Sequence, residues 1–394
     1  KILATLSGGM PSAKDRYELS FSASEIQQEQ LGSVLENSVL VDAIYKRIKE
    51  IQLDTTELDR GQGAGDQNHS VIDVITSQVE RVELDPQSSS KHTSKDSISK
   101  EARVSTKWPI IHLTNKDVLQ ARVLVGTDGK KSLVREVAHL PWYSHDYKQH
   151  AVVVNVEMDE ESAYHYESNT TAWQRFLSTG PIGLLPISAP AVTSNIMNIV
   201  WSTTPTEAEA LKLCSEADFL REVNIALQGA PGFHAMSTNK PKLSLRAKAV
   251  IPCMPAVPMF PTNRATFPLS LGHAPEYVRN RIVLLGDAAH CIHPMAGQGV
   301  NLGIYDAEAL SEVIQVAAAA GSDIGGDGDI HLLPYQKDRL PKNVAMMLAI
   351  HSLKSIYEVE NESFNSLRGI GMNLWNLSPT IKSQTIRVAM GLDV

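Results

Sequence analysis

The sequence predicts an α/β fold in which one nucleotide-binding lobe is assembled from separated segments and a β-rich lobe is inserted between them. Residues 281–321 have the pattern of a strand, a turn and a helix. Residues 151–265 are dominated by short apolar runs typical of strands, whereas residues 33–125 combine a helix pattern with strand patterns. We therefore expect αβ segments on both sides of a central β-rich block.

Composition favours a globular enzyme and argues against other classes. The chain has 394 residues, of which 43% are apolar, so it can bury a substantial core. Its formal net charge of -8 argues against a nucleic-acid-binding surface, which needs clustered Lys and Arg. The sequence has no run of about 18 apolar residues, so no transmembrane helix is predicted. The three cysteines are not at metal-ligand spacing, so neither a metal site nor a disulfide framework is expected.

The first part of the chain alternates structured and polar stretches. Apolar residues in 33–53 recur mostly at three- and four-residue steps and predict a helix. We expect a loop at Gly61–Ser70 and one or two strands within Ser70–Leu84. Residues 85–107 are rich in Ser, Lys and Asp and predict a surface insertion. Two further strands and the turn between them are expected at Ile110–Leu113, Ala121–Val125 and Asn115–Asp117.

The central block and the C-terminal part differ in their expected secondary structure. Residues from about 330 onward have mostly helical patterns. In the central block, strands are expected at Ala151–Val156, Gly183–Pro186 and Ile196–Trp201. Helical patterns interrupt them at Glu207–Leu213 and Asp218–Leu227.

The segment Arg281–Asn301 carries the clearest functional pattern. Its four consecutive apolar residues, 282–285, predict a buried parallel strand. Gly286 allows a turn at the end of that strand. Asp287 then stands just beyond the carboxyl end of a strand, where open α/β sheets bind ligands. A carboxylate at this place accepts hydrogen bonds from ribose hydroxyls.

A second ligand-facing element follows in the same segment. After Pro294, the run Gly297–Asn301 leads into a helix pattern over residues 302–316. Glycines let a ligand approach the backbone, and N–H groups at a helix start favour negative charge. An acidic turn, a Pro and paired glycines at this short spacing favour a ligand site over an ordinary strand–turn–helix unit.

The string from Gly286 to Asn301, G-D-A-A-H-x-x-H-P-x-x-G-Q-G-x-N, is similar to the second FAD motif of the class A flavoprotein monooxygenases, the p-hydroxybenzoate hydroxylase-like family. The resemblance implies FAD as the cofactor. It also implies a catalytic loop against the isoalloxazine ring, with no acid or base residue assigned, formed by Pro294, Gly297, Gln298 and Gly299. His290 is expected to form hydrogen bonds near the cofactor, and no metal ligands are predicted.

A second segment supports this resemblance. Gly126-Thr127-Asp128-Gly129 with Ser132, Val134 and Arg135 looks like the family's G-A-D-G-x-x-S-x-V-R segment. A strand leads again into an acidic turn and a helix start, which Ser132 is placed to cap. The two segments together predict the cofactor-binding residues Gly126, Asp128, Gly129, Ser132, Arg135, Gly286, Asp287, Ala288, Val300 and Asn301.

The resemblance implies an FAD-binding, Rossmann-like lobe that lacks its first βαβ unit, an inserted β-rich substrate lobe and a helical C-terminus. We expect a partial FAD-binding lobe at 1–140 with the polar insertion at 85–107, and the substrate lobe at 141–265. The second flavin motif then lies in 266–325, and the C-terminal helices in 326–394.

Further strings narrow the resemblance to the ubiquinone-biosynthesis hydroxylases of this family, in their eukaryotic mitochondrial form. It runs from about residue 31 to the C-terminus, interrupted at 54–107, and rests on Glu36–Leu40, Trp173–Leu177, Gly180–Pro186, Phe267–Leu269 and Gly272–Arg279. It implies hydroxylation at C5 of a polyprenylated hydroxybenzoate or phenol through a flavin hydroperoxide. It also implies electrons from ferredoxin and its reductase, a ubiquinone-biosynthesis complex, and peripheral association with the matrix side of the mitochondrial inner membrane.

The sequence departs from the family at its N-terminal side. The family begins with a βαβ unit carrying G-x-G-x-x-G, which binds the FAD pyrophosphate. The glycines of 61–65 lie in a polar loop with the wrong spacing, and Leu6–Met10 has a Gly pair without a preceding strand. We therefore expect either an N-terminal truncation or a short form, with poor FAD affinity and an exposed sheet edge.

Two alternatives remain open. One is a hydroxylase of the same fold that acts on another, soluble aromatic substrate. The other is a catalytically silent subunit of a biosynthetic complex, which lacks FAD because it lacks the βαβ unit. A NAD-dependent dehydrogenase is disfavoured, because it needs the missing G-x-G-x-x-G and has no use for the loop Gly297–Asn301.

Overall fold

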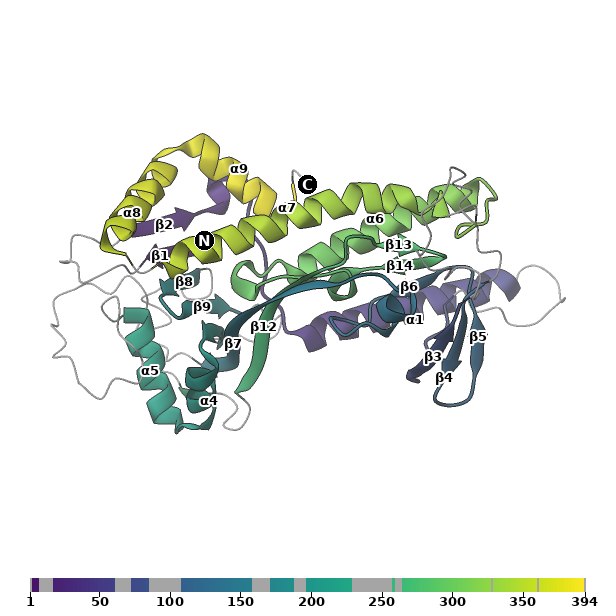
Figure 1. Cartoon of the computed structure of the whole chain (residues 1–394), viewed down its shortest axis with the longest axis horizontal. Helices are drawn as coiled ribbons and strands as arrows, with labels where there is room; N and C mark the ends of the chain where they lie inside the picture. Colours follow the sequence, from purple (N-terminus) through teal and green to yellow (C-terminus); the bar gives the residue numbers. More distant parts are fainter. Residues whose placement is uncertain are drawn as a thin grey trace, which may run out of the picture.

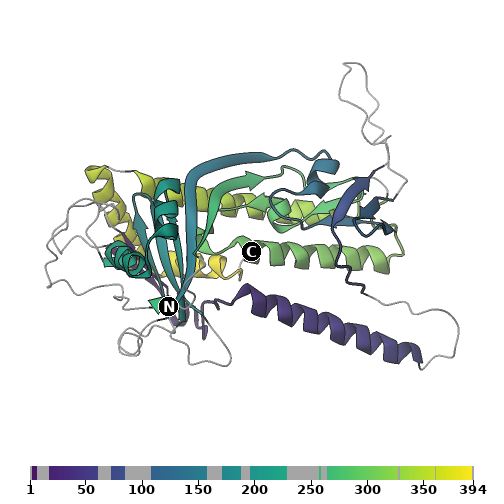
Figure 2. The same cartoon turned by 90° about the horizontal axis from the view of Figure 1, so that it is seen from below.

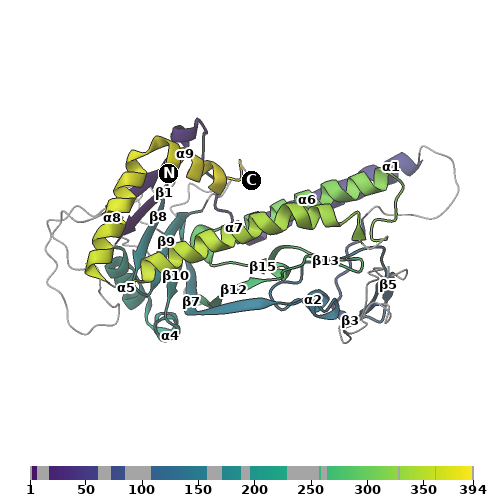
Figure 3. The ribbon, with the colours of Figure 1, turned by 45° about the horizontal axis from the view of Figure 1, so that its top comes forward.

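The computed structural model describes residues 2–6, 17–60, 72–84, 108–157, 171–187, 196–228, 257–258, 264–326, 329–359 and 361–392. Figure 1 shows a large sheet toward one end of the molecule and two small sheets toward the other. The helices α6 (Gly299–Ala319) and α7 (Leu333–Glu358) run side by side above them, and α7 reaches both ends (Figure 3).

Within the described ranges, the large sheet has nine strands, in the order β15-β12-β7-β10-β9-β8-β1-β2 with β11 paired to β7. Its neighbours are antiparallel, except that β1 runs parallel to β8. The bounds are β1 Ile2–Leu6, β2 Tyr17–Phe21, β7 Tyr143–Glu157, β8 Ala172–Leu177, β9 Gly180–Pro186, β10 Ile196–Thr203, β11 Val257–Pro258, β12 Ala265–His273 and β15 His290–Cys291.

Two small sheets of three strands each lie beyond the end of β7. One has the order β3-β4-β5, formed by Val79–Glu83, Ile110–Leu113 and Val118–Gln120. The other has the order β13-β14-β6, formed by Val278–Arg279, Ile282–Leu284 and Leu124–Gly126. In the latter, β14 and β6 are parallel, and β6 has no neighbour on its other side among the described residues. The exposed sheet edge that the sequence predicts stays a prediction.

Several helices pack against these sheets and help to form two large apolar cores. Besides α6 and α7, the α-helices of the described residues are α1 Asn37–Arg60, α2 Leu133–Val137, α4 Pro205–Leu213, α5 Glu216–Gln228, α8 Glu362–Leu377 and α9 Pro379–Ala389. One core lies between the large sheet and α4 and α5, around the wholly buried Ile182, Met197 and Phe219. The other surrounds the strand Ile282–Leu284 and includes Tyr335 of α7. The large sheet and the small sheet around β14 therefore have separate apolar cores.

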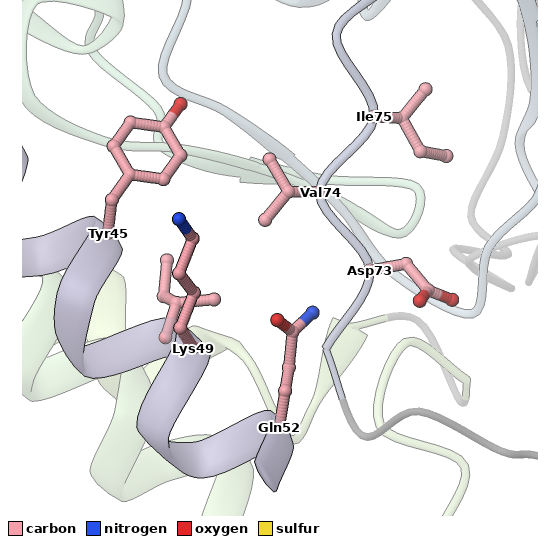
Figure 4. Close-up of a pocket in the computed structure, with 7 residues that line it drawn as sticks. Tyr45, Lys49, Gln52, Asp73, Val74 and Ile75 are labelled. Atoms are coloured by element: carbon pink, nitrogen blue, oxygen red, sulfur yellow. The ribbon is translucent and has the colours of Figure 1, made fainter.

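The first long helix is placed differently from the others. In Figure 2, α1 lies apart from the sheets at the edge of the molecule. Its apolar side chains Val39, Ile44 and Leu53 are between 42% and 65% exposed. Between α1 and residues 73–75 there is an open cavity of about 580 Å³, lined by apolar and polar side chains (Figure 4). The apolar residues whose spacing predicted this helix are therefore not buried by the described residues.

Most of the predicted elements are confirmed with shifted ends. The helix expected at 33–53 is α1, at 37–60. The strands expected in the central block, its two helices and the helical C-terminal part are all present. The strand expected at Ala121–Val125 is shorter and begins at Leu124. The predicted loop at 61–70 and the insertion at 85–107 lie outside the described residues.

Within Ser70–Leu84 the structure has one strand, Val79–Glu83, in agreement with the one or two strands expected there. One prediction about the N-terminal part was wrong. Leu6 does end a strand, β1, which the sequence analysis missed. This short strand is formed through long-range pairing with β8, for which a local pattern gives no signal.

Gly180, at the tight connection between β8 and β9, tests the packing of the large sheet. Its φ is +139°, and a Cβ there would lie 2.4 Å from the carbonyl oxygen of Ser202. We expect Gly180→Ala to lower the free energy of unfolding by about 2 kcal/mol or more, through backbone strain and steric overlap. Urea denaturation measures this. Gly183→Ala in β9 is the control, because its Cβ would meet nothing closer than 3.7 Å; equal losses for both variants would argue against this packing.

Candidate functional site

The candidate site is built on the pairing of β14 with β6. These two strands are parallel, with Leu284 opposite Gly126, so the turns that follow them lie at the same edge of the sheet. The backbone N–H of Leu285 donates to the carbonyl of Gly126 at 3.0 Å and extends the pairing into the turns. The two segments singled out in the sequence, 126–135 and 286–301, are thus neighbours in space. Ligands of open α/β sheets bind at such an edge.

Arg135 joins the two turns. Its guanidinium donates to the carbonyl of Ala288 at 2.8 Å and to that of Lys130 at 2.7 Å. It also lies over the ring of Trp142, 4.0 Å from the centroid. Burial lowers the pKa of Arg135, while the nearby Asp128 and Glu136 oppose that shift. The predicted cofactor-binding Arg135 therefore holds the turn around Asp287 in place from inside the protein.

The two acidic residues of the turns have different surroundings. One oxygen of Asp128 accepts the backbone N–H groups of Leu133 and Val134, at 2.7 and 3.2 Å, and so caps α2. Ser132 caps the same helix by accepting the N–H of Arg135 at 3.0 Å, as predicted. Asp287 is exposed and accepts no hydrogen bond from the described residues. Its carboxylate is therefore available to a ligand, whereas that of Asp128 is already occupied in part.

The predicted catalytic loop lies next to this edge. Pro294–Ala296 form a single 3-10 turn, and Gly297 follows with a φ of +63°, which favours glycine. The loop leads into α6, whose first N–H groups have no partner within the helix. Gln174 of β8 donates to the carbonyl of Met295 at 3.0 Å. This contact joins the loop to the large sheet.

The C-terminal part of the chain contacts the start of α6. Gln298 donates through its side-chain amide to the carbonyl of Ala389 at 3.0 Å. Tyr305 donates to the carbonyl of Met390 at 3.2 Å. Of the predicted loop residues, Gln298 is thus involved in holding the end of α9, while Val300 at the start of α6 is 63% exposed.

His293 lies behind the loop and is wholly buried. Its Nδ1 accepts the backbone N–H of Met295 at 3.2 Å, and its Nε2 has no hydrogen-bond partner among the described residues. Burial, followed by the charge of Lys354, lowers the pKa of His293 to about 4. The ring is therefore neutral at neutral pH, with its proton on Nε2.

These groups fit one end of a flavin. The free carboxylate of Asp287 suits hydroxyl groups, and the helix start at Gly299–Asn301 suits a negatively charged ring edge. Within the described ranges, no strand leads into the G-x-G-x-x-G turn that binds a pyrophosphate in this family. No group of His, Cys, Asp or Glu side chains within those ranges is arranged to hold a metal ion.

Sequence reasoning missed one part of the site. Asp306 of α6 is wholly buried and accepts the backbone N–H of Gly286, which precedes Asp287. A signal for it exists in the sequence. Asp306 lies four residues after Leu302 and four before Leu310, both buried, so it is a charged residue on the apolar face of a helix.

Comparison with known families assigns most of the chain. Residues 79–347 match the family described as FAD binding domain. The chain is 32% identical over 371 residues to the ubiquinone biosynthesis monooxygenase COQ6, mitochondrial, of Danio rerio, and covers 68% of that protein. It is 37% identical over 297 residues to the protein of the same name from Mus musculus, of which it covers 59%. The aligned regions are 92% and 72% of this chain, respectively.

Solved structures with the same fold include monooxygenases. The p-nitrophenol 4-monooxygenase PnpA from Pseudomonas putida matches all of this chain and 82% of its own, with a TM-score of 0.64 at 14% identity. Klebsiella pneumoniae HpxO, solved in complex with FAD and uric acid, matches 79% of this chain and 66% of its own, with a TM-score of 0.51 at 16% identity. At these identities the likeness shows the fold alone. It confirms the α/β flavoprotein fold that the sequence predicts.

Arg135→Lys tests the bridge between the two turns. A lysine cannot reach both carbonyls and stack on Trp142, so we expect the free energy of unfolding to fall by about 2 kcal/mol. Urea denaturation measures the loss. Arg279→Lys is the control, because Arg279 bonds to Glu276 and the carbonyl of His139 at a more exposed place, away from the turns. A loss no larger than that of the control would show that the bridge is not important.

His293 predicts a pH dependence of stability. Because its pKa falls from 6.5 to about 4 on folding, the unfolded chain binds more protons between these pH values. The free energy of unfolding should therefore decrease as the pH falls from 6.5 to 4, by up to about 3 kcal/mol from this group. His293→Asn keeps an acceptor for Met295 but does not titrate. Unfolding curves of the two proteins should diverge in this window; parallel pH profiles would contradict the prediction.

Proposed function

The chain belongs to the FAD-dependent aromatic-ring monooxygenases, and we propose that it hydroxylates a prenylated aromatic ring in ubiquinone biosynthesis with FAD as its cofactor. The reaction proposed is hydroxylation at C5 of a polyprenylated hydroxybenzoate or phenol. The chain spans about three fifths to two thirds of several of the relatives that it resembles, so their activity is carried over here as part of the proposal.

The observation that carries this proposal is the free carboxylate of Asp287. It stands beyond the carboxyl ends of two paired parallel strands and next to a helix start, and no described residue occupies it. In the proposed complex, Asp287 accepts hydrogen bonds from ribityl hydroxyl groups of FAD, in the part of the cofactor next to the pyrophosphate. The buried Arg135 and Ser132 and the exposed Asp128 then act by fixing the backbone of the two turns.

The flavin ring is assigned to the loop of Pro294, Gly297, Gln298 and Gly299. When bound and reduced, FAD activates molecular oxygen and supplies one oxygen atom to the aromatic ring. The residues of this chain orient the ring system and exclude water. The N–H groups of Val300 and Asn301 at the start of α6 favour negative charge on the flavin edge. No side chain of the loop is assigned as an acid or a base.

The aromatic substrate is proposed to lie between this loop and the large sheet. The side chain of Gln174 in β8 donates a hydrogen bond to the loop carbonyl of Met295, so one strand of the sheet contacts the loop. The proposal of a prenylated substrate derives from the relatives, whose name places them in ubiquinone biosynthesis. On this basis residues 141–265 are proposed as the substrate lobe. Residues 1–140 and 266–325 are proposed as the FAD-binding lobe, and residues 326–394 as a helical C-terminal part.

Partners and location are further parts of this proposal. From the family resemblance of the sequence, we propose ferredoxin and ferredoxin reductase as electron donors, and a ubiquinone-biosynthesis complex as the setting. The relatives are named as mitochondrial proteins. We propose a peripheral location on the matrix side of the inner membrane. Among the described helices, none has the length and apolar character needed to span a membrane.

Asp287→Ala tests the cofactor site. Removing a charged acceptor of a hydrogen bond should weaken FAD binding about tenfold or more. Quenching of flavin fluorescence on titration with the protein measures the dissociation constant. Glu312→Gln on the exposed part of α6 is the control, because it removes an acidic side chain from the same lobe away from the turn. An unchanged dissociation constant for Asp287→Ala would remove the main support for this site.

Turnover with two substrates tests the proposed reaction. The full chain with FAD, ferredoxin, its reductase and NADPH should add one oxygen atom to a polyprenylated hydroxybenzoate and not to free 4-hydroxybenzoate. Mass spectrometry detects the product, and NMR locates the new hydroxyl at C5. Preference for the free acid would favour a hydroxylase with a soluble substrate. Failure of the purified chain to bind any flavin would favour a silent subunit.

A further inference from the structure

Asp306 connects two helices to the turn that carries Asp287. Its side chain is wholly buried on α6 and is the acceptor for four donors. Gly286 of the turn and Gly303 of α6 face each other at this place: a Cβ built on either would lie 3.5 to 3.7 Å from the other's Cα, which is van der Waals contact. The start of α6 therefore lies directly against the turn.

One oxygen of Asp306 faces the turn. This Oδ2 accepts the backbone N–H of Gly286 at 3.1 Å and lies 2.6 Å from Nε2 of His290. Both groups are less than four residues from Asp287. The turn Gly286–Ala288 is thus held at its beginning by Asp306 and at its end by Arg135, which donates to the carbonyl of Ala288.

The other oxygen faces α7. This Oδ1 accepts Nε of Arg339 and Nδ2 of Asn343, both at 3.0 Å. Arg339 is 3% exposed and Asn343 is wholly buried, so these contacts are shielded from water. Asp306 thus ties α7 to the turn.

The four donors fill the hydrogen-bond acceptor positions of the Asp306 carboxylate and keep it charged. A carboxylate offers about four acceptor positions. Burial acts to raise the pKa of Asp306, but the hydrogen bonds from His290, Asn343 and Arg339 outweigh it and keep the pKa below its usual value. With its acceptor positions filled, Asp306 has none left for a ligand, so any effect on ligand binding must act through the turn.

We propose that Asp306 is a positioning residue, which fixes the turn Gly286–Ala288 and so sets the direction of the Asp287 carboxylate. The coupling of α7 to the turn follows from the contacts of this chain alone. The consequence for FAD rests on the proposed function. Asp306 is not a catalytic residue in this account, because it touches neither cofactor nor substrate.

Asp306→Asn separates the two halves of this network. The asparagine amide has one oxygen, which accepts, and one NH2 group, which only donates. The NH2 group must therefore face two donors in place of a carboxylate oxygen. Either the pair Gly286 and His290 or the pair Arg339 and Asn343 then loses its acceptor. Asp329→Asn is the matched control. Asp329 is also buried and accepts two backbone N–H groups, those of Asn280 and Arg281, at the opposite end of β14.

Amide hydrogen exchange of the full chain, followed by mass spectrometry of the peptide covering residues 285–291, tests the coupling without a cofactor. Asp306→Asn should speed exchange there about tenfold or more, the factor expected for a lost hydrogen bond to a charged group. Asp329→Asn should speed exchange around residues 279–282 instead. Equal exchange of 285–291 in Asp306→Asn and the wild type would overturn the proposal. If Asp306→Asn does not fold, His290→Phe removes a donor to the same oxygen and carries the same expectation.

FAD titration then tests the positioning role. The dissociation constant should rise about tenfold or more in Asp306→Asn and stay within about twofold of the wild type in Asp329→Asn. Equal affinities in the two variants, despite faster exchange of the turn, would contradict the effect on the cofactor. If the wild-type chain binds no FAD, the proposed function fails, and hydrogen exchange still decides whether Asp306 holds the turn.

Discussion

The parallel pairing of β6 with β14 is the constraint on which the candidate site depends. It brings together two turns that are about 160 residues apart in the sequence and makes both chains leave the sheet at one edge. Both strands have only three residues, so backbone pairing alone holds them weakly. Side chains stabilise the arrangement: Arg135 bonds to the carbonyl of Ala288 across the two turns, and Asp306 accepts the N–H of Gly286. This leaves Asp287 as the exposed acidic group between two fixed points.

The helix α7 relates this site to the large sheet. Near its beginning, Tyr335 donates to the carbonyl of Leu284 at 2.8 Å, and Arg339 binds Asp306. Near its end, Tyr357 stacks on Phe176 of β8 with ring centroids 3.8 Å apart. One continuous helix thus contacts both the strand that precedes Asp287 and the sheet proposed to hold the substrate. Gln174, two residues before Phe176, closes the connection by bonding to the loop carbonyl of Met295.

Local sequence patterns predicted the helices, strands and turns around the site, but they could not predict the long-range contacts that hold the site together. The apolar run 282–285, the glycines and Asp287 indicate a strand end with a ligand, and that arrangement depends on neighbouring residues only. Ser132 is recognisable as a helix cap for the same reason. The role of Arg135 inside the protein depends on Ala288, 153 residues away, and Asp306 depends on α7. The strand Ile2–Leu6 was missed because its pairing with β8 spans 170 residues. Spacing cannot show which distant residues meet, although a charged residue on an apolar helix face, as at Asp306, does indicate a buried partner.

We propose that Asp287 and the loop Pro294–Gly299 together bind one flavin. A crystal structure of the full chain with FAD tests it most directly. We expect a ribityl hydroxyl of FAD within about 3.2 Å of the Asp287 carboxylate, and the isoalloxazine ring against the loop. A flavin bound elsewhere on the molecule, with Asp287 facing solvent and the loop unoccupied, would contradict it.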